Sequence, residues 1–443
     1  MLMLQHQSER TSPMDSIEQL LAGTYRDPDT GQPVQIGTRA LVIQPSLARS
    51  EADLVGALGL GRRLAVVSDV NTHPVLGQRV ERALGGRFSV SSVVLPDGVH
   101  PDDTTVAKVR AATATADALV AVGSGTINDL CKFGSAQDGK PYVVFATAPS
   151  MNGYTSFNAA ITMHGHKMSL PAQVPLGAFF DLEVLAAAPP RLIRAGLGDS
   201  LCRATAQADW LLAHLLWGNP YRTLPFDLLK DDESPLFEQA AALMQGDKDA
   251  IGRLVRVLIL AGLGTAIVGH SQPASQGEHL ISHYIDMFAP ASRPLIYHGE
   301  QVAVTTLSMA RLQEAMLAQP PSVVPDSATE AEFRARYGDE IGASCWAEFS
   351  QKRLDAAKAE ALQHTIATRW NDIADQVGKV MVPSARLHEV MAATGAGLTP
   401  EAIHLSREFY EQALLRCREI RNRYTFLDLA ASSGALGPLI AKL

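Results

Sequence analysis

One segment in the first half of the chain constrains the fold more than any other. Residues 118–122, ALVAV, form a run of small and branched apolar side chains, which indicates a buried strand. This pattern ends at the turn GSGT (123–126), and the residues INDLCKF (127–133) then begin a helical pattern. A strand that passes through a tight glycine turn into a helix is typical of an α/β fold.

The same turn predicts an anion-binding site. The first N–H groups of a helix have no partner within the helix, and the helix dipole adds positive charge there. A phosphate or pyrophosphate is therefore favoured, and glycine lets the backbone approach it closely. The turn lacks the third glycine of the Rossmann GxGxxG pattern, so a strand–helix turn without a ligand is the alternative.

Strand-like and helical patterns alternate from residue 34 to residue 146. Strands are predicted at 40–43, 64–69, 89–95, 118–122 and 142–146, and helices at 50–60, 73–85, 102–116 and 127–136. Such alternation favours βαβ units and a parallel sheet. We therefore expect a Rossmann-like α/β N-terminal domain over residues 34–190, preceded by a flexible lead-in at 1–33.

The character of the sequence changes after Pro189 and Pro190. Amphipathic periods of three to four residues follow at 199–217, 235–245, 249–269, 276–288, 299–318, 328–337, 343–377, 384–393, 399–420 and 425–441. They predict a separate all-α C-terminal domain over residues 191–443. Within it, the stretch 319–380 is rich in alanine and charge, and we expect it to be peripheral.

Composition excludes several classes of protein. A hydrophobic content of 47% with 19% charged residues is ordinary for a soluble globular enzyme, and the net charge of −8 argues against a nucleic-acid partner. No apolar run is long enough to predict a membrane span, and the first residues lack the pattern of a signal peptide. The four cysteines lack CxxC spacing, so neither a disulfide framework nor a cysteine-rich zinc site is expected, and a reducing cytoplasm is favoured.

Polar residues follow three of the predicted strands, where ligands of open α/β sheets bind. Asp69 ends one strand, and its carboxylate either accepts hydrogen bonds from ribose hydroxyls or caps the helix that begins near residues 72–74. The second feature is the turn at 123–126. The third is the loop TAPSMNGYTS (147–156), whose hydroxyl and amide groups favour binding, an ordinary crossover loop being the alternative.

Three histidines and an aspartate in the helical part suggest a metal site. GEHLISH (277–283) places His279 and His283 four residues apart on one helix face, and His298 follows at another expected helix start. GLGDS (196–200) is expected to place Asp199 in the first turn of a helix. Imidazole with carboxylate suits Zn²⁺, Fe²⁺ or Ni²⁺. Histidine pairs also occur by chance, and the spacing does not decide which of the pair is a ligand.

Together these motifs resemble the sn-glycerol-1-phosphate dehydrogenases, within the wider group of iron-containing alcohol dehydrogenases, glycerol dehydrogenases and dehydroquinate synthases. The resemblance covers roughly residues 35–310. It is carried by GSGTINDLCK (123–132), TAPSMNGYTS (147–156), GLGDS (196–200), GEHLISH (277–283) and YHG (297–299). It implies a dehydroquinate synthase-like fold, with a dinucleotide-binding α/β domain and a helical domain that binds metal and substrate.

The resemblance also implies a role for each matching residue. NAD(H) or NADP(H) is expected to contact Asp69, Gly123, Ser124, Gly125, Thr126, Ile127, Thr147, Ala148, Pro149, Ser150 and Ser156. One divalent metal, Zn, Ni or Fe, is expected on Asp199, His279 and His298. His283 is implied to be the substrate-side histidine, so Asp199 and His283 are the expected catalytic residues. Asn152 and Lys167 are expected to join them at the substrate, with a solvated surface lysine as the alternative for Lys167.

The implied function is a metal-dependent, NAD(P)-linked interconversion of dihydroxyacetone phosphate and sn-glycerol 1-phosphate. Asn152 departs from the family, which usually has an aspartate there, so a dehydrogenase of another polyol, phosphorylated alcohol or phosphonate alcohol is the alternative. A dehydroquinate synthase-like lyase and a non-catalytic cofactor-binding protein are further alternatives. Asp69 favours NAD, because a carboxylate would repel a 2′-phosphate. The apolar helical surface favours a homo-oligomer.

Overall fold

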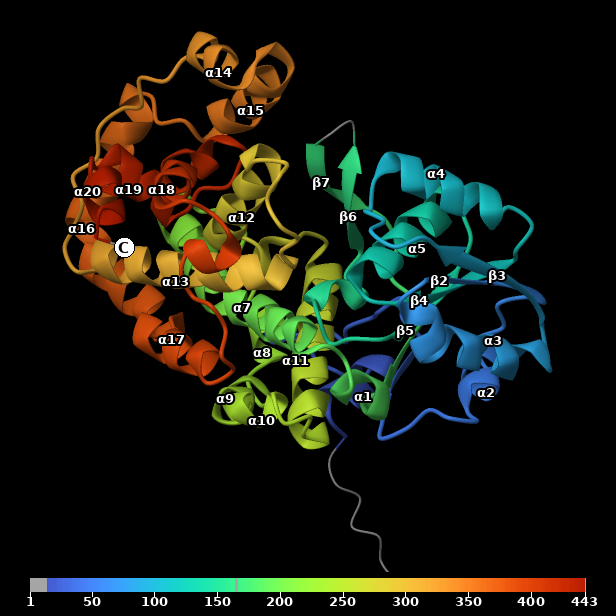
Figure 1. The fold of residues 1–443 in the computed structure, drawn as a ribbon. Coiled ribbons are helices and arrows are strands. Elements are labelled where there is room, and N and C mark those ends of the chain that lie inside the picture. The colour runs from blue at the N-terminus through green and yellow to red at the C-terminus, as the bar shows by residue number, and fades with distance from the viewer. Residues whose placement is uncertain (1–13, 164–165, 443) are drawn as a thin grey trace, which may run out of the picture.

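A six-stranded parallel sheet forms the centre of the N-terminal part (Figure 1). The computed structural model describes residues 14–163 and 166–442. The strands are β1 (Ala40–Gln44), β2 (Arg63–Asp69), β3 (Ser89–Leu95), β4 (Ala118–Gly123), β5 (Tyr142–Ala146) and β8 (Gly177–Asp181), in the order β1-β8-β5-β4-β2-β3. The order reverses between β2 and β4, and ligands of such sheets bind beside the carboxyl ends at this point.

Helices cover both faces of the sheet (Figure 1). On one face, α2 (Glu51–Gly56), η1 (His73–Gly77) and α3 (Gln78–Gly85) pack on inward side chains such as Val66 and Val120. On the other face, α4 (Asp103–Ala112) and α5 (Gly125–Gln137) pack on Val67 and Ala121. Neighbouring strand residues thus enter different cores, because side chains alternate between the two faces of a strand. The α/β prediction is confirmed.

Two features of this part were not predicted as strands. β8 (GAFFD) lies between β1 and β5 in the sheet. β6 (Asn158–Met163) and β7 (His166–Pro171) form an antiparallel hairpin apart from the main sheet, with Asn158 opposite Pro171. β7 contacts α12 (Gly277–Phe288), so the hairpin joins the α/β part to the helical part.

The predicted flexible lead-in is wrong for residues 14–33, whereas residues 1–13 lie outside the described part. Helix α1 (Ser16–Leu21) begins at a capping box formed by Asp15 and Glu18. The apolar side of this short helix, Ile17 and Leu20, is buried in the apolar cluster that also contains side chains of the sheet. The Tyr25 hydroxyl donates a hydrogen bond of 2.7 Å to the Asp227 carboxylate.

Beyond residue 190, the described part of the chain contains helices and no strand. The elements that connect the sheet to this part and position the site are η2 (Asn152–Tyr154), α6 (Leu182–Ala186), α7 (Pro190–Trp217), α8 (Leu224–Asp227), α9 (Glu233–Glu238), α10 (Ala240–Leu243), α11 (Lys248–Val268), η3 (Gln272–Ala274), α12 and α13 (His298–Leu317). The rest are α14 (Glu330–Tyr337), α15 (Asp339–Lys352), α16 (Ala356–Val380), α17 (Ser384–Ala392), η4 (Glu401–Ile403), α18 (Arg407–Arg416), η5 (Cys417–Glu419), α19 (Phe426–Ser432) and α20 (Leu436–Ile440). The division into two domains at residues 190 and 191 remains a prediction, because one apolar cluster contains side chains from both parts.

The region 319–380 is packed more closely than its composition suggests. The single pattern predicted at 343–377 is two helices, α15 and α16, because the Asp355 side chain caps α16 at the Lys358 N–H. Phe333, Phe349 and Trp370 are buried in a second core with α7, α12 and α19. Although α14 and α15 lie at the outer end of the molecule (Figure 1), this region is part of that core.

Helix α11 is the one described helix that is long and apolar enough to cross a membrane, judged by length and composition alone. In the folded chain, 67% of its most apolar 18-residue window is buried. The core helix of a globular protein passes the same test, so this feature is weak evidence for a membrane span.

Helix α7 begins earlier than predicted, and this changes the setting of Asp199. The residue lies well inside the helix instead of in its first turn. Two glycines just before it allow two close backbone contacts. A Cβ on Gly196 would lie 1.7 Å from the Pro149 carbonyl oxygen, and one on Gly198 would lie 2.2 Å from the Gly299 carbonyl oxygen. Helices α7 and α13 therefore touch backbone to backbone beside Asp199.

This contact predicts a large loss of stability for Gly299→Ala. A Cβ there would lie 1.8 Å from the Ala195 carbonyl oxygen, so the helices must separate. We expect a loss of about 3 kcal/mol in the free energy of unfolding, measured by urea denaturation with a chelator present. Gly378→Ala in α16 is the control, since no described heavy atom lies within 4 Å of its Cβ position; it should be neutral or stabilising by up to about 1 kcal/mol. Equal stability of the two variants would contradict the prediction.

Candidate active site

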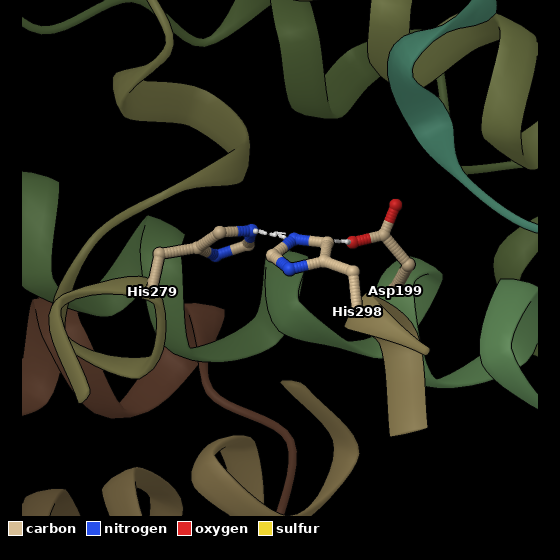
Figure 2. A group of neighbouring side chains, drawn as sticks. All are labelled: Asp199, His279 and His298. Atoms are coloured by element: carbon tan, nitrogen blue, oxygen red, sulfur yellow. Dashed lines mark hydrogen bonds and ion pairs between the residues drawn. The ribbon is translucent and has the colours of Figure 1, made fainter. Parts of the chain in front are cut away.

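Three side chains from distant parts of the sequence converge in the helical part. Figure 2 shows Asp199, His279 and His298 pointing toward one another from α7, α12 and α13. The Nε2 atoms of the two histidines are 3.2 Å apart. The Asp199 Oδ1 atom lies 3.8 Å from Nε2 of His298 and 4.0 Å from Nε2 of His279. The predicted ligand set is therefore brought together.

The donor atoms of this cluster fit a divalent metal ion. Two ligands each about 2.1 Å from one ion are about 3.4 Å apart at a tetrahedral angle, close to the three distances here. The Asp199 Oδ1 atom is buried and has no hydrogen-bond donor within the described residues. A buried carboxylate oxygen without a partner is costly, and a cation would satisfy it. One carboxylate and two imidazoles suit Zn²⁺, Fe²⁺ or Ni²⁺.

Glu278 orients the His279 ring. Its Oε1 atom accepts hydrogen bonds from His279 Nδ1 at 2.9 Å and from the Gln276 N–H at 2.7 Å. Its Oε2 atom accepts one from the Thr205 hydroxyl at 2.9 Å. Burial raises the pKa of Glu278, but these interactions with His279 and the backbone outweigh it and hold the pKa below its usual value. A carboxylate on Nδ1 leaves Nε2 of His279 facing the cluster.

A second possible ligand group, Cys202 with Glu278 and His279, fits a metal less well. The Cys202 thiol donates to the Asp199 backbone carbonyl at 2.9 Å, and burial raises its pKa well above the usual value. His279 Nδ1 is already bonded to Glu278. The group that contains Asp199 is therefore the better metal site.

His283 lies beside the cluster but is not part of it. Its ring centroid is 5.8 Å from that of His279 and 6.4 Å from that of His298. Its ring nitrogens have no hydrogen-bond partner among the residues that the structure describes. Burial, followed by the positive charge of Arg421, lowers the pKa of His283 well below its usual value. The geometry thus favours His279 over its neighbour as the ligand, which the spacing alone left open.

The glycine turn has the conformation that an anion site requires. Gly123 ends β4, Ser124 is the N-cap of α5, and residues 125–127 form its first turn. The Ser124 side chain makes no capping hydrogen bond, although its backbone carbonyl accepts one from the Asn128 N–H at 3.0 Å. The first N–H groups of α5 therefore lack a side-chain cap, which leaves them available to a phosphate. A Cβ added at Gly125 would lie 3.0 Å from the Met151 sulfur, so a larger residue there would press on this side chain.

The Asp69 side chain binds the turn just before η1, although the N-cap of that helix is Thr72, without a side-chain cap. Its Oδ1 atom accepts hydrogen bonds from the N–H groups of Asn71 and Thr72, at 2.9 and 2.7 Å, and one from the Thr72 hydroxyl. This arrangement holds Asp69 at the carboxyl end of β2, next to β4 in the sheet. These bonds use only one carboxylate oxygen, so ribose binding by the other stays a prediction.

A buried lysine ties α5 to the loop 147–158. The Lys132 side chain is fully buried, and its ammonium donates to the Gly153, Ser156 and Asn158 carbonyls and to the Ser156 hydroxyl. Burial lowers the pKa of Lys132 to about 8, with the Asp129 carboxylate opposing this shift. Neither Lys132 nor Glu278 was singled out from the sequence, although both lie inside the motifs quoted above. The signal that could have revealed them is a charged residue on a helix face that is otherwise buried.

The other predicted cofactor residues of this loop are held by internal contacts. The Thr147 N–H donates to the Gly123 carbonyl at 3.1 Å, and the Ala148 carbonyl accepts from the Tyr154 hydroxyl at 2.6 Å. Pro149 packs against Gly196, and Ser150 follows it. The Ser156 hydroxyl is bonded within the loop, so its predicted contact with the dinucleotide would compete with these bonds. The roles of these residues toward a cofactor remain predictions.

Two of the predicted substrate residues, Asn152 and Lys167, lie on separate elements, η2 and β7. The Asn152 N–H donates to Asp199 Oδ2 at 2.7 Å, so the loop contacts the cluster directly. Lys167 lies on β7, and its positive charge contributes to lowering the pKa of His298, after the effect of burial. A role of Lys167 at the substrate stays a prediction, with a solvated surface lysine as its alternative.

Comparison with known proteins gives consistent relatives. A family model described as iron-containing alcohol dehydrogenase matches residues 42–189. The chain is similar to glycerol-1-phosphate dehydrogenases (NAD(P)+) of two bacteria. It is 27% identical to that of Bacillus licheniformis, covering 95% of this chain and 94% of the relative. It is 32% identical to that of Bacillus velezensis, covering 70% of this chain and 83% of the relative.

Solved structures share the fold. A maleylacetate reductase from Agrobacterium tumefaciens superposes with a TM-score of 0.63 at 15% identity, over 92% of this chain and 97% of that one. A glycerol dehydrogenase from Schizosaccharomyces pombe superposes with a TM-score of 0.60 at 16% identity, over 91% and 90%. At this identity the likeness concerns the fold alone, and it confirms the predicted fold class.

The hydrogen bond from His279 to Glu278 predicts that Glu278→Gln weakens metal binding. The amide keeps the shape of the side chain but removes the charge that holds the His279 ring. We expect an affinity for Zn²⁺ that is about 10- to 100-fold lower, measured by competition with a chromophoric chelator. Glu360→Gln, at an exposed position on α16, is the control. Unchanged affinity in both variants would show that Glu278 does not support the site.

The Lys132 network predicts a second effect. Lys132→Met leaves several carbonyl oxygens without their donor, so we expect a loss of at least about 2 kcal/mol in the free energy of unfolding. Because the loop is then less firmly held, NADH binding measured by fluorescence should also weaken. Lys108→Met, at an exposed position on α4, should change neither quantity. Wild-type stability of the Lys132 variant would contradict the assigned role.

Proposed function

The chain belongs to the family of glycerol-1-phosphate dehydrogenases, among the iron-containing alcohol dehydrogenases, and we propose on this basis that it is a metal-dependent, NAD(P)-linked oxidoreductase. Its reaction interconverts dihydroxyacetone phosphate and sn-glycerol 1-phosphate. The observation that supports this most is the convergence of Asp199, His279 and His298, with a buried carboxylate oxygen that lacks a donor among the described residues, beside His283.

The carboxyl edge of the sheet binds the dinucleotide. The first turn of α5, from Gly125 to Ile127, binds the pyrophosphate through its N–H groups, together with Gly123 and Ser124. Residues 147–150 and Ser156 contact the cofactor from the loop that Lys132 holds. When bound, NAD(H) or NADP(H) carries the hydride. The free oxygen of Asp69 is suited to ribose hydroxyls, which supports a preference for NAD(H).

The helical part binds the metal and the reacting end of the substrate. A divalent ion on Asp199, His279 and His298 would supply Lewis acidity to the substrate carbonyl or alkoxide oxygen. Glu278 keeps the His279 ring oriented for this role. His283 has free ring nitrogens beside the cluster, so it orients the substrate or passes a proton between it and solvent. Direct metal analysis of the purified protein would identify the ion as Zn, Ni or Fe.

The environment of Asn152 gives a reason to test a second substrate class. Its backbone is bonded to Asp199, so its side chain lies close to where the substrate reacts. An amide there has no negative charge to repel a phosphate, whereas the family's usual aspartate does. Asn152 and Lys167 therefore suit a phosphorylated substrate. Another polyol, phosphorylated alcohol or phosphonate alcohol is the alternative. The enzyme is proposed to act in the cytoplasm as a homo-oligomer.

The two histidines of α12 should have separable roles. His279→Ala removes a metal ligand, so metal content and turnover should fall together. His283→Ala leaves all three ligands, so metal content should stay near the wild-type value while turnover falls by about 100-fold, as expected for loss of an acid–base group. Elemental analysis and NADH absorbance measure the two quantities. Retained metal with normal turnover in the His279 variant would refute the ligand assignment.

A substrate panel tests the reaction itself. With NADH and added Zn²⁺, Ni²⁺ or Fe²⁺, dihydroxyacetone phosphate should be reduced with a net loss of NADH absorbance, whereas a dehydroquinate synthase-like lyase returns the hydride and shows no net change. Asn152→Asp should raise the KM for dihydroxyacetone phosphate by about 10-fold, because one charge is added beside the phosphate ester. Bound metal without turnover on any alcohol or ketone would instead favour a non-catalytic cofactor-binding protein.

A further inference from the structure

One turn of α7 carries two buried polar side chains that contact the start of α12. Thr205 and Asp209 are four residues apart, so they lie on the same side of the helix. The Asp209 Oδ2 atom accepts a hydrogen bond of 3.0 Å from the N–H of Gly277, the first residue of α12. The Thr205 hydroxyl donates to Glu278 Oε2 at 2.9 Å. The first two residues of α12 are thus held by this turn of α7.

The other oxygen of Asp209 binds the start of a second helix. Its Oδ1 atom accepts a hydrogen bond of 2.9 Å from the N–H of Phe426, the first residue of α19. The first N–H groups of a helix have no partner within it, and a negative group is favourable there. Asp209 therefore joins α7, α12 and α19 at one point.

No opposite charge holds Asp209 in this position. Within residues 14–163 and 166–442 it forms no ion pair with a lysine, arginine or histidine. Burial raises the pKa of Asp209 to about 8, against the two backbone hydrogen bonds. A buried carboxyl group without a cation is costly, but both of its oxygens accept hydrogen bonds in either protonation state. An asparagine would offer one acceptor oxygen, so two N–H groups require the carboxyl group.

The start of α12 has no room to move toward its neighbours. A Cβ on Gly277 would lie 2.7 Å from Asp209 Oδ2, and closer still to the methyl carbon of Met309 on α13. The first residue of α12 is therefore enclosed by α7 and α13. These are the helices that carry Asp199 and His298, the other two members of the cluster.

The contacts reach the cluster through Glu278 and His279. The Glu278 side chain accepts from the Thr205 hydroxyl with one oxygen and from His279 Nδ1, at 2.9 Å, with the other. A path of hydrogen bonds thus runs from α7 to the ring whose Nε2 faces the cluster. Metal–ligand distances hold within about 0.2 Å, so a small displacement of this ring weakens a bond to an ion.

We propose that Thr205 and Asp209 are positioning residues, which fix the start of α12 so that the His279 ring meets Asp199 and His298. This inference rests on the proposed function, because it takes those three side chains as the metal ligands. Neither Thr205 nor Asp209 was singled out from the sequence, since both lie between the recognised motifs.

The first test compares Asp209→Asn with Asp181→Asn. Asp181 is also a buried carboxylate that accepts N–H groups at a helix start, but it caps α6 beside the sheet. Both variants should be less stable in urea, whereas only Asp209→Asn should bind Zn²⁺ about 10- to 100-fold more weakly, measured by chelator competition. The visible absorption of bound Co²⁺, which depends on ligand geometry, should change in the same variant alone. Equal losses of Zn²⁺ affinity would overturn the proposal, because reduced stability would explain both.

Thr205 gives a milder test, which does not depend on the folding of Asp209→Asn. Thr205→Val keeps the shape of the side chain but removes the donor to Glu278, so Zn²⁺ affinity should fall by about 10-fold. Thr205→Ser restores the hydroxyl and should restore the affinity. Wild-type affinity and Co²⁺ absorption in Thr205→Val, or in a folded Asp209→Asn, would show that these residues do not position the ligand.

Because these measurements need no substrate, they separate the inference from the proposed function. If the wild type binds metal but does not reduce dihydroxyacetone phosphate, the proposed reaction is wrong, while the affinities of the variants still decide the roles of Thr205 and Asp209. If the wild type binds none of Zn²⁺, Ni²⁺, Fe²⁺ or Co²⁺, both the metal site and its positioning residues are refuted.

Discussion

The backbone contact between α7 and α13 is the constraint on which the candidate site depends. Gly198 and Gly299 each stand next to a residue of the cluster, Asp199 and His298, and neither position has room for a Cβ. Because the helices touch there, side chains as short as aspartate and histidine reach one another from separate elements. Any larger residue would move the two donor atoms apart by more than a metal bond tolerates. The cluster geometry is therefore a product of helix packing.

A second set of buried polar contacts joins this cluster to the sheet. Lys132 holds the loop that follows β5, and the same loop donates from Asn152 to Asp199. The glycine turn, the loop and Asp199 of the candidate metal site are thus linked by hydrogen bonds. Buried polar networks are stable only when each member is satisfied, so this path is sensitive to change at any of its members.

Local patterns predicted most of the α/β part, whereas the family resemblance implied the ligand set. The β4 strand, its glycine turn and α5 were recognisable because strand and helix signals lie next to each other in the sequence. β8 was missed because GAFFD is a short apolar run without flanking signals, and the start of α7 was missed because glycines inside a helix resemble a turn. Gly198 serves a contact with Gly299 of α13 and Gly196 one with Pro149, and no local pattern contains such distant contacts.

The supporting residues were harder to predict than the ligands for the same reason. The spacing of His279 and His283 left open which of them could be a ligand. The family resemblance implied His279, and the position of Asp199 and His298 in space favours it. Glu278 and Lys132 act through partners on other elements.

Helix α7 has a mechanical consequence. Its 28 residues span about 42 Å as one rigid rod. Near one end, Gly196 touches Pro149 of the loop and Asp199 receives the Asn152 N–H; farther along, the helix is buried in the second core. The loop 147–156 and Asp199 are therefore fastened to the same rod. If the loop binds the dinucleotide and Asp199 a metal, as proposed, the spacing between these two groups is part of the fold before any substrate arrives.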